Sequence, residues 1–158
     1  MTEMNISIEI DPAFAGCVKA AWLKNIVRRS LQIQGCGPKT EVGLIITGQQ
    51  KIHELNNKYM EEDRPTDVLS FPLLDFPDKK GFVVPPDGVT RLGDVIVSFP
   101  QAVLQAEEHG HTVENEMTTL IVHGLLHLLG FDHAEEKETR KMKARESAIL
   151  KELGSFPA

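Results

Sequence analysis

The pattern of apolar residues predicts an α+β protein in which one β-sheet is packed with about five helices. Four segments have the alternation or the short apolar run of a β-strand, and helical patterns lie between and after them. The chain has 158 residues, the length of one ordinary domain, and its hydrophobic fraction of 41% suffices for a core. We therefore expect residues 1–158 to form a single domain.

The N-terminal segment is predicted to be a strand followed by a long helix. Residues 5–10 carry isoleucine at every second position, which is typical of a half-buried strand. Asp11 can cap the next helix and Pro12 suits its first turn, so this helix should run to about Gln34. Its inward residues are predicted to be Val18, Trp22, Ile26 and either Leu31 or Ile33. We interpret its basic outer residues as a solvated face rather than an RNA contact: Lys24, Arg28 and Arg29.

The middle of the chain is predicted to hold two more strands and one helix. Residues 41–47 and 67–71 have strand patterns. Residues 49–59 have a helical pattern, with three positions spaced for burial: Ile52, Leu55 and Tyr59. Residues 73–91 are rich in proline and glycine and are long for a structureless connection. Either residues 81–84 form a short edge strand, or the segment is a flap near the functional site, and we favour the flap.

The C-terminal part is predicted to hold the last strand and three helices. Residues 92–99 are apolar almost throughout, which indicates a strand covered on both faces. Ser98 begins a helix that ends near His109. A second helix starts near Thr112 and is apolar on nearly every side, so it belongs in the core. Residues 134–153 form a charged helix that should dock on the outside through a thin apolar stripe: Met142, Ile149 and Leu153.

The core helix carries the candidate metal ligands. Residues 120–133 contain three histidines at H-x3-H-x5-H spacing. Residues four apart lie on one face of a helix, so His123 and His127 can direct ring nitrogens at one point. Gly130 ends the helix, and the reversal of the chain there brings His133 back as a third ligand. A single histidine in a core helix is usually a hydrogen-bonded core residue, but three imidazoles with an open fourth position favour one catalytic Zn²⁺.

Two further histidines, His109 and His111, flank Gly110 at the predicted end of the preceding helix. Both are candidate ligands, because imidazole binds divalent metals. A histidine at the C-terminus of a helix also complements the helix dipole, and we favour this structural role for the pair.

The stretch from His123 to His133, H-G-L-L-H-L-L-G-F-D-H, resembles the H-G-x-L-H-L-x-G-(Y/F)-D-H signature of the YbeY family, bacterial endoribonucleases of ribosomal RNA maturation. Two further blocks are similar to that family and follow the family's order: P-T-D-V-L-S-F-P at residues 65–72 and L-G-D-V-I-V-S at residues 92–98. The resemblance implies a four-stranded mixed sheet with a central, zincin-like, metal-binding helix.

The resemblance also suggests which residues act beside the metal. A metalloprotease helix places glutamate directly after its first histidine, where this chain has Gly124, so peptide hydrolysis is disfavoured. The family usually has an arginine, thought to help catalysis, where this chain has Met60. Arg64 lies four residues further on and is our candidate for contacting the phosphate. Asp132 is a candidate proton acceptor, although we favour a role in orienting an imidazole. His123 is assigned to catalysis through the metal.

The resemblance implies a zinc-dependent, single-strand-specific endoribonuclease that matures the 3′ end of 16S rRNA and takes part in ribosome quality control. The expected partners are rRNA, the small ribosomal subunit and ribosome-assembly proteins. The three histidines alone indicate only a metallohydrolase. Two alternatives therefore stay open: a noncatalytic ribosome-assembly factor with a structural zinc, and a metallohydrolase that acts on a non-RNA substrate.

Composition limits the environment and the mode of binding. The net charge of -6 argues against a protein that coats nucleic acid nonspecifically. A metal or a local basic patch can still bind phosphate on an acidic protein. Cys17 and Cys36 are isolated, and the sequence shows neither a signal peptide nor a segment that spans a membrane. We therefore expect reduced thiols, a cytoplasmic protein and no membrane partner.

Overall fold

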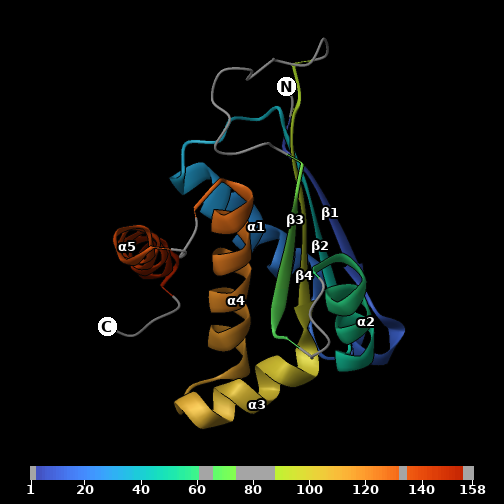
Figure 1. Cartoon of the computed structure of the whole chain (residues 1–158). Coiled ribbons are helices and arrows are strands. Elements are labelled where there is room, and N and C mark those ends of the chain that lie inside the picture. Colours follow the sequence, from blue (N-terminus) through green and yellow to red (C-terminus); the bar gives the residue numbers. More distant parts are fainter. Residues whose placement is uncertain (1–2, 61–65, 74–87, 132–134, 155–158) are drawn as a thin grey trace.

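A computed structural model describes residues 3–60, 66–73, 88–131 and 135–154 (Figure 1). Four strands form one mixed sheet in the order β1-β2-β4-β3. The three strands β1, β2 and β4 are parallel, and β3 is antiparallel to β4. The strands are β1 (Asn5–Ile10), β2 (Thr40–Thr47), β3 (Val68–Pro72) and β4 (Thr90–Ser98). The predicted α+β class and the four-stranded mixed sheet are confirmed.

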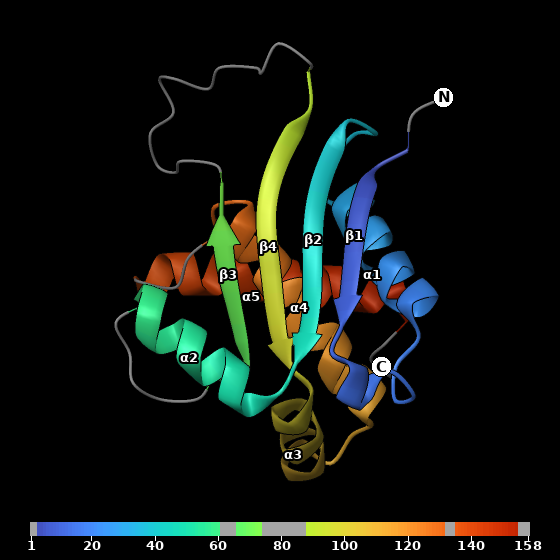
Figure 2. The same cartoon turned by 90° about the vertical axis from the view of Figure 1, so that its right-hand side faces the viewer.

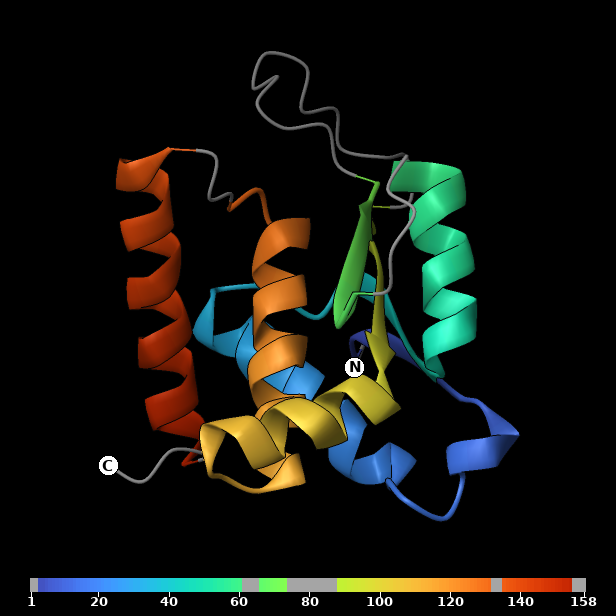
Figure 3. The same cartoon turned by 60° about the horizontal axis from the view of Figure 1, so that its bottom comes forward.

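The helices form layers on the two faces of the sheet. Figures 1 and 2 show α1, α4 and α5 on one side, α2 over β3 and β4 on the other side, and α3 at one end of the strands. Figure 3 shows α5 running beside α4, on the side away from the sheet. The bounds are α1 (Ala20–Ile33), α2 (Gln49–Met60), α3 (Phe99–His109), α4 (Val113–Leu128) and α5 (Glu136–Leu153). Among the described helices, none combines the length and the apolar character needed to cross a bilayer.

The first predicted helix is wrong in extent. The Asp11 side chain accepts a hydrogen bond from the backbone N–H of Ala13 at 2.9 Å, but it caps only a short 3-10 turn, η1 (Pro12–Phe14). A turn that contains Gly16 follows, and α1 begins at Ala20. Val18 therefore precedes the helix. Ile26 and Leu31 are buried, as predicted, and two residues that were not predicted are fully buried beside them: Leu23 and Val27.

The strand β4 lies between β2 and β3 and is covered from both sides, as predicted. Val95 and Val97 belong to the main core between the sheet and the helices α1 and α4. Ile96 faces the opposite way, where it packs with Ile52 of α2 and Leu69 of β3. The burial predicted for Tyr59 is wrong: its ring lies edge-to-face with Phe71 at the margin of this cluster, and the residue is 56% exposed.

The helix α4 is the centre of the packing. Its buried residues include Met117, Ile121, Val122 and Leu126, which contact the sheet on one side and α5 on the other. Gly124 lies against the sheet: a Cβ atom there would stand 2.5 Å from Cγ1 of Val95. Because any side chain at this position would collide with β4, the glycine allows α4 to approach the strands closely.

Candidate metal centre

The last two turns of α4 bring His123 and His127 together, as their spacing predicts. Their Nε2 atoms lie 3.1 Å apart, and their ring centroids are 4.7 Å apart with an interplanar angle of 72°. Two nitrogens bound to one tetrahedral Zn²⁺ at about 2.0–2.1 Å would be about 3.3 Å apart. The observed pair therefore fits two ligands of one ion with little movement, and both side chains are only half-buried and can be reached from solvent.

A carboxylate from another helix contacts the ring nitrogen of His123 that does not face His127. Oε1 of Glu146, on α5, makes a short contact with Nδ1 of His123. A ligating histidine commonly donates its other ring N–H to a carboxylate, which fixes the tautomer and the ring orientation. With Nδ1 engaged by Glu146, Nε2 of His123 is the nitrogen available for a metal, and it is this atom that faces His127. Sequence reasoning missed Glu146, because nothing in the charged pattern of α5 distinguishes it from the other glutamates.

The position of Glu146 follows from how α5 docks. Three of its residues pack with Val122 and Leu126 of α4 and were only partly predicted: Met142, Ile149 and Leu150. Next to Glu146, Nε of Arg145 donates to Oε1 of Gln34 at 2.9 Å, which ties α5 to the end of α1. Apolar packing and this hydrogen bond together place the carboxylate over α4.

The turn after α4 has the predicted geometry. Gly130 has a φ of 96°, in the left-handed region, and the backbone N–H of Phe131 donates to the carbonyl of Leu126 at 3.0 Å. This 6→1 hydrogen bond belongs to the Schellman ending, which reverses the chain. The predicted third ligand His133, the adjacent Asp132 and the predicted phosphate contact Arg64 lie outside the described residues, as do residues 81–84. Their roles stay predictions.

The three sequence blocks that carry the resemblance meet at Gly124. The strand β3, from the block at residues 65–72, pairs with β4, from the block at residues 92–98. The Ser70 hydroxyl on β3 donates to the carbonyl of Gly124 at 2.9 Å, and Val95 on β4 packs against the same glycine. A glutamate at position 124, as a metalloprotease would require, has no room here. The structure thus gives a physical reason for the departure from the protease pattern.

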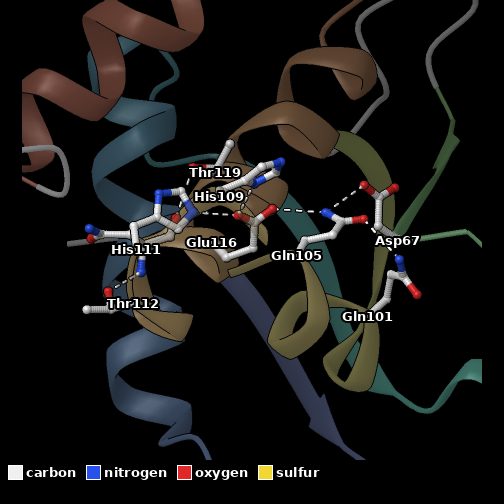
Figure 4. A network of polar contacts seen from close by, with 9 residues as sticks. Asp67, Gln101, Gln105, His109, His111, Thr112, Glu116 and Thr119 are labelled. Atoms are coloured by element: carbon white, nitrogen blue, oxygen red, sulfur yellow. Dashed lines mark hydrogen bonds and ion pairs between the residues drawn. The ribbon is translucent and has the colours of Figure 1, made fainter. Parts of the chain in front are cut away.

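A second group of polar side chains lies at the other end of α4 (Figure 4). Oε1 of Glu116, a residue only 2% exposed, lies 2.9 Å from Nδ1 of His109 and 2.5 Å from Nε2 of His111. The amide of Gln105 donates to Oε2 of Glu116 at 2.9 Å and to Oδ2 of Asp67 at 3.3 Å. The two histidine nitrogens and a carboxylate oxygen lie within 4.8 Å of one another, so this group has the donors and the spacing to hold a metal ion.

The electrostatics of this group favour its charged forms. Burial opposes ionisation of Glu116, but hydrogen bonds from His109, His111 and Gln105 outweigh it and lower the pKa of the carboxyl group. The hydrogen bond to Glu116, and then the negative charge of that residue, raise the pKa of His109. The interaction with the helix dipole expected for the two histidines stays a prediction; the contact observed for both is with the side chain of Glu116. Sequence reasoning missed Glu116 as their partner; its spacing from the His-Gly-His turn was the signal available.

Comparisons with known proteins agree with the resemblance. The family model described as Endoribonuclease YbeY matches residues 16–154. The chain is 45% identical to an Endoribonuclease YbeY of Dehalococcoides mccartyi (strain CBDB1), with 95% of this chain and 93% of the relative covered. It is 41% identical to an Endoribonuclease YbeY of Roseiflexus sp. (strain RS-1), with 97% and 95% covered.

A solved structure is also similar. The solution structure of TM1509 from Thermotoga maritima matches with a TM-score of 0.57 and 26% sequence identity, covering 96% of this chain and 93% of that chain. The family model and the curated relatives both extend over nearly the whole sequence, including the histidine stretch of α4. The chain therefore belongs to the YbeY family of endoribonucleases.

Proposed function

We propose that this protein is a zinc-dependent, single-strand-specific endoribonuclease that matures the 3′ end of 16S rRNA and takes part in ribosome quality control. The observation that carries the proposal is the pair of convergent Nε2 atoms of His123 and His127, 3.1 Å apart, in a chain that belongs to an endoribonuclease family. The proposed partners are rRNA, the small ribosomal subunit and ribosome-assembly proteins, and the proposed location is the cytoplasm.

The chain supplies the parts of a single-metal hydrolytic site. One Zn²⁺, held by His123, His127 and His133, would supply a Lewis acid that lowers the pKa of water to about 7 and polarises a phosphoryl oxygen. Glu146 keeps Nε2 of His123 directed at the site. Arg64 is proposed to contact the scissile phosphate, and Asp132 to orient an imidazole or accept a proton. Gly124 contributes no base, since its backbone is packed on β4.

The net negative charge of the chain fits RNA binding that is centred on the metal site rather than spread over the protein surface. A net charge of -6 gives little general attraction for phosphates, so affinity must come from the metal and from contacts near it. This predicts that cleavage depends on the metal more strongly than on a broad basic surface.

A noncatalytic ribosome-assembly factor with a structural zinc is the second candidate. Met60, at the position where the family usually has an arginine, favours it. This candidate predicts ribosome binding that survives loss of the metal-bound water, and no RNA cleavage by zinc-loaded protein. The third candidate, a metallohydrolase of non-RNA substrates, would have to take its base from outside α4.

The decisive experiment is cleavage of a single-stranded RNA that carries a 3′ extension of small-subunit rRNA. Chelated protein and zinc-reconstituted protein are compared, with circular dichroism to show that both remain folded. We expect cleavage only with zinc, its loss in His123→Ala, and its retention in the matched control His53→Ala on α2. Absence of cleavage by folded, zinc-loaded protein would refute the nuclease proposal and favour the assembly factor or a hydrolase of a non-RNA substrate.

A further inference from the structure

Two imidazoles converge on one buried carboxylate oxygen at the corner where α3 ends and α4 begins (Figure 4). His109 is the last residue of α3, and His111 follows it across Gly110, whose φ of 70° turns the chain. Glu116 lies in the first turns of α4. The turn thus directs nitrogens from both sides of the corner onto the same oxygen atom of Glu116.

Three nitrogen-bearing side chains surround the Glu116 carboxylate. Gln105 donates to Oε2, and Nε2 of His111 lies 2.5 Å from Oε1. His109 has a side chain that is 54% exposed and that water could solvate, yet its Nδ1 lies 2.9 Å from the same Oε1. Two imidazoles and one carboxylate are a common ligand set for a divalent cation, and the three ligand atoms here lie within 4.8 Å of one another.

We propose that His109, His111 and Glu116 form a second metal site, separate from that of His123 and His127, which binds a first-row divalent cation such as Zn²⁺. Ligands of a tetrahedral Zn²⁺ lie about 3.3 Å apart, given bond lengths of about 2.0–2.2 Å. The two nitrogen-to-oxygen distances, 2.9 and 2.5 Å, must therefore widen by less than about 1 Å. The larger change is at His111, whose side chain is 22% exposed, and the smaller one is at His109, whose side chain is 54% exposed.

The donor set and its surroundings indicate which ion the site selects. Imidazole nitrogens suit zinc, nickel and cobalt, whereas magnesium and calcium prefer sites built from oxygen atoms. The Glu116 side chain is held by Gln105, which in turn contacts Asp67 before the start of β3. Such a hydrogen-bonded carboxylate is the orienting support that metal ligands commonly have.

The site is structural rather than part of the reaction. Glu116 and His123 are seven residues apart on α4, which separates them by about 10 Å along the helix axis. Two-metal catalysis needs ions about 3.5–4 Å apart, so an ion at Glu116 cannot share a phosphate with one at His123. Its role is to clamp α3 to α4 and, through Gln105, to fix the segment that leads into β3.

The experiment counts zinc ions by isothermal titration calorimetry with Zn²⁺ alone. Wild-type protein should bind two ions, and His109→Ala should bind one. A triple variant, His123→Ala with His127→Ala and His133→Ala, should bind one ion and lose at least tenfold in affinity when His109→Ala is added. The matched control, His53→Ala in the triple background, should leave that affinity unchanged, and excess Mg²⁺ should not compete.

A thermal melt gives an independent readout. Zn²⁺ should raise the Tm of the triple variant and should not raise it once His109→Ala is added, because an ion that binds only folded protein stabilises it. The proposal is overturned if the folded triple variant binds no zinc, or if His109→Ala and His53→Ala change its affinity equally. If the triple variant does not fold, the proposal is still overturned if wild-type protein and His109→Ala bind the same number of zinc ions. Neither result depends on RNA cleavage, so this test is independent of the proposed function.

Discussion

Removing the carboxylate behind His123 should weaken metal binding without touching a metal ligand. In Glu146→Ala, Nδ1 of His123 loses the group that fixes its tautomer and ring orientation. Loss of such an orienting partner typically costs about 10–100-fold in metal affinity, or about 1.4–2.8 kcal/mol. The Glu146 side chain is only 18% exposed, and that of His123 only 32%, so solvent cannot readily replace the contact. We therefore expect Glu146→Ala to fall in the upper part of that range.

A graded pair of variants separates orientation from charge. Glu146→Gln keeps an acceptor oxygen at the same distance from the backbone but removes the negative charge, so its loss should be smaller, about tenfold. The matched control is Glu138→Ala, an exposed glutamate on the same helix that should have no effect. The assay is competition for Zn²⁺ against a chromophoric chelator, with NMR of the metal-free protein to report the tautomer of His123.

Two results would contradict an orienting role of Glu146. If Glu146→Ala binds Zn²⁺ as tightly as Glu138→Ala does, the carboxylate does not orient the ligand. If affinity falls but the His123 tautomer is unchanged, the effect of Glu146 is electrostatic rather than positional. A loss of helix content in Glu146→Ala would instead show that the residue supports α5, and Glu146→Gln would then decide between the roles.

Three further predictions follow from packing and protonation. Gly124→Ala places a methyl group 2.5 Å from Cγ1 of Val95. Overpacking costs about 1–3 kcal/mol and the better helix propensity of alanine offsets about 1 kcal/mol, so urea unfolding should show a net loss of stability of up to about 2 kcal/mol. A more stable variant would contradict the close packing of α4 on β4. Leu126→Ala removes a side chain 1% exposed between α4 and α5 and should cost about 2–5 kcal/mol in the same assay; a loss below 1 kcal/mol would mean that α5 is not packed there. The raised pKa of His109 and the lowered pKa of Glu116 should make their contact most stabilising between about pH 4.5 and 6.5, fading as pH rises through the folded pKa of His109 or falls through that of Glu116. The difference in unfolding free energy between wild type and His109→Gln, measured across pH, should peak in that window, and a flat difference would contradict the assignment.

Local signals predicted most of the fold. Ser98 and Thr112 cap α3 and α4 through side-chain hydrogen bonds to Gln101 and Asn115, as sequence reasoning on helix starts expects. Isoleucine at every second position likewise predicted β1, because alternate side chains of a strand point to the same face of the sheet. The wrong start predicted for α1 also has a physical reason. Asp11 and Pro12 begin a helical turn, but the turn that contains Gly16 ends it after η1, and α1 begins only at Ala20.

The candidate site was predictable only where it is local. His123 and His127 share one helix, so their spacing fixes their approach. Glu146 reaches His123 through the docking of α5, and that docking depends on packing with residues far away in sequence. Glu116 meets His109 and His111 through the angle between two helices, which no periodicity encodes.

The dependence of His123 on α5 has a consequence for the order of events during synthesis. The sheet and α4 are translated before α5, so the two histidines leave the ribosome ahead of the carboxylate that orients one of them. A nascent chain thus carries the imidazoles without their fixed geometry. The oriented pair arises only once α5 has folded back onto α4, so that an enzyme proposed to cut ribosomal RNA would gain its metal geometry only after α5 has been translated.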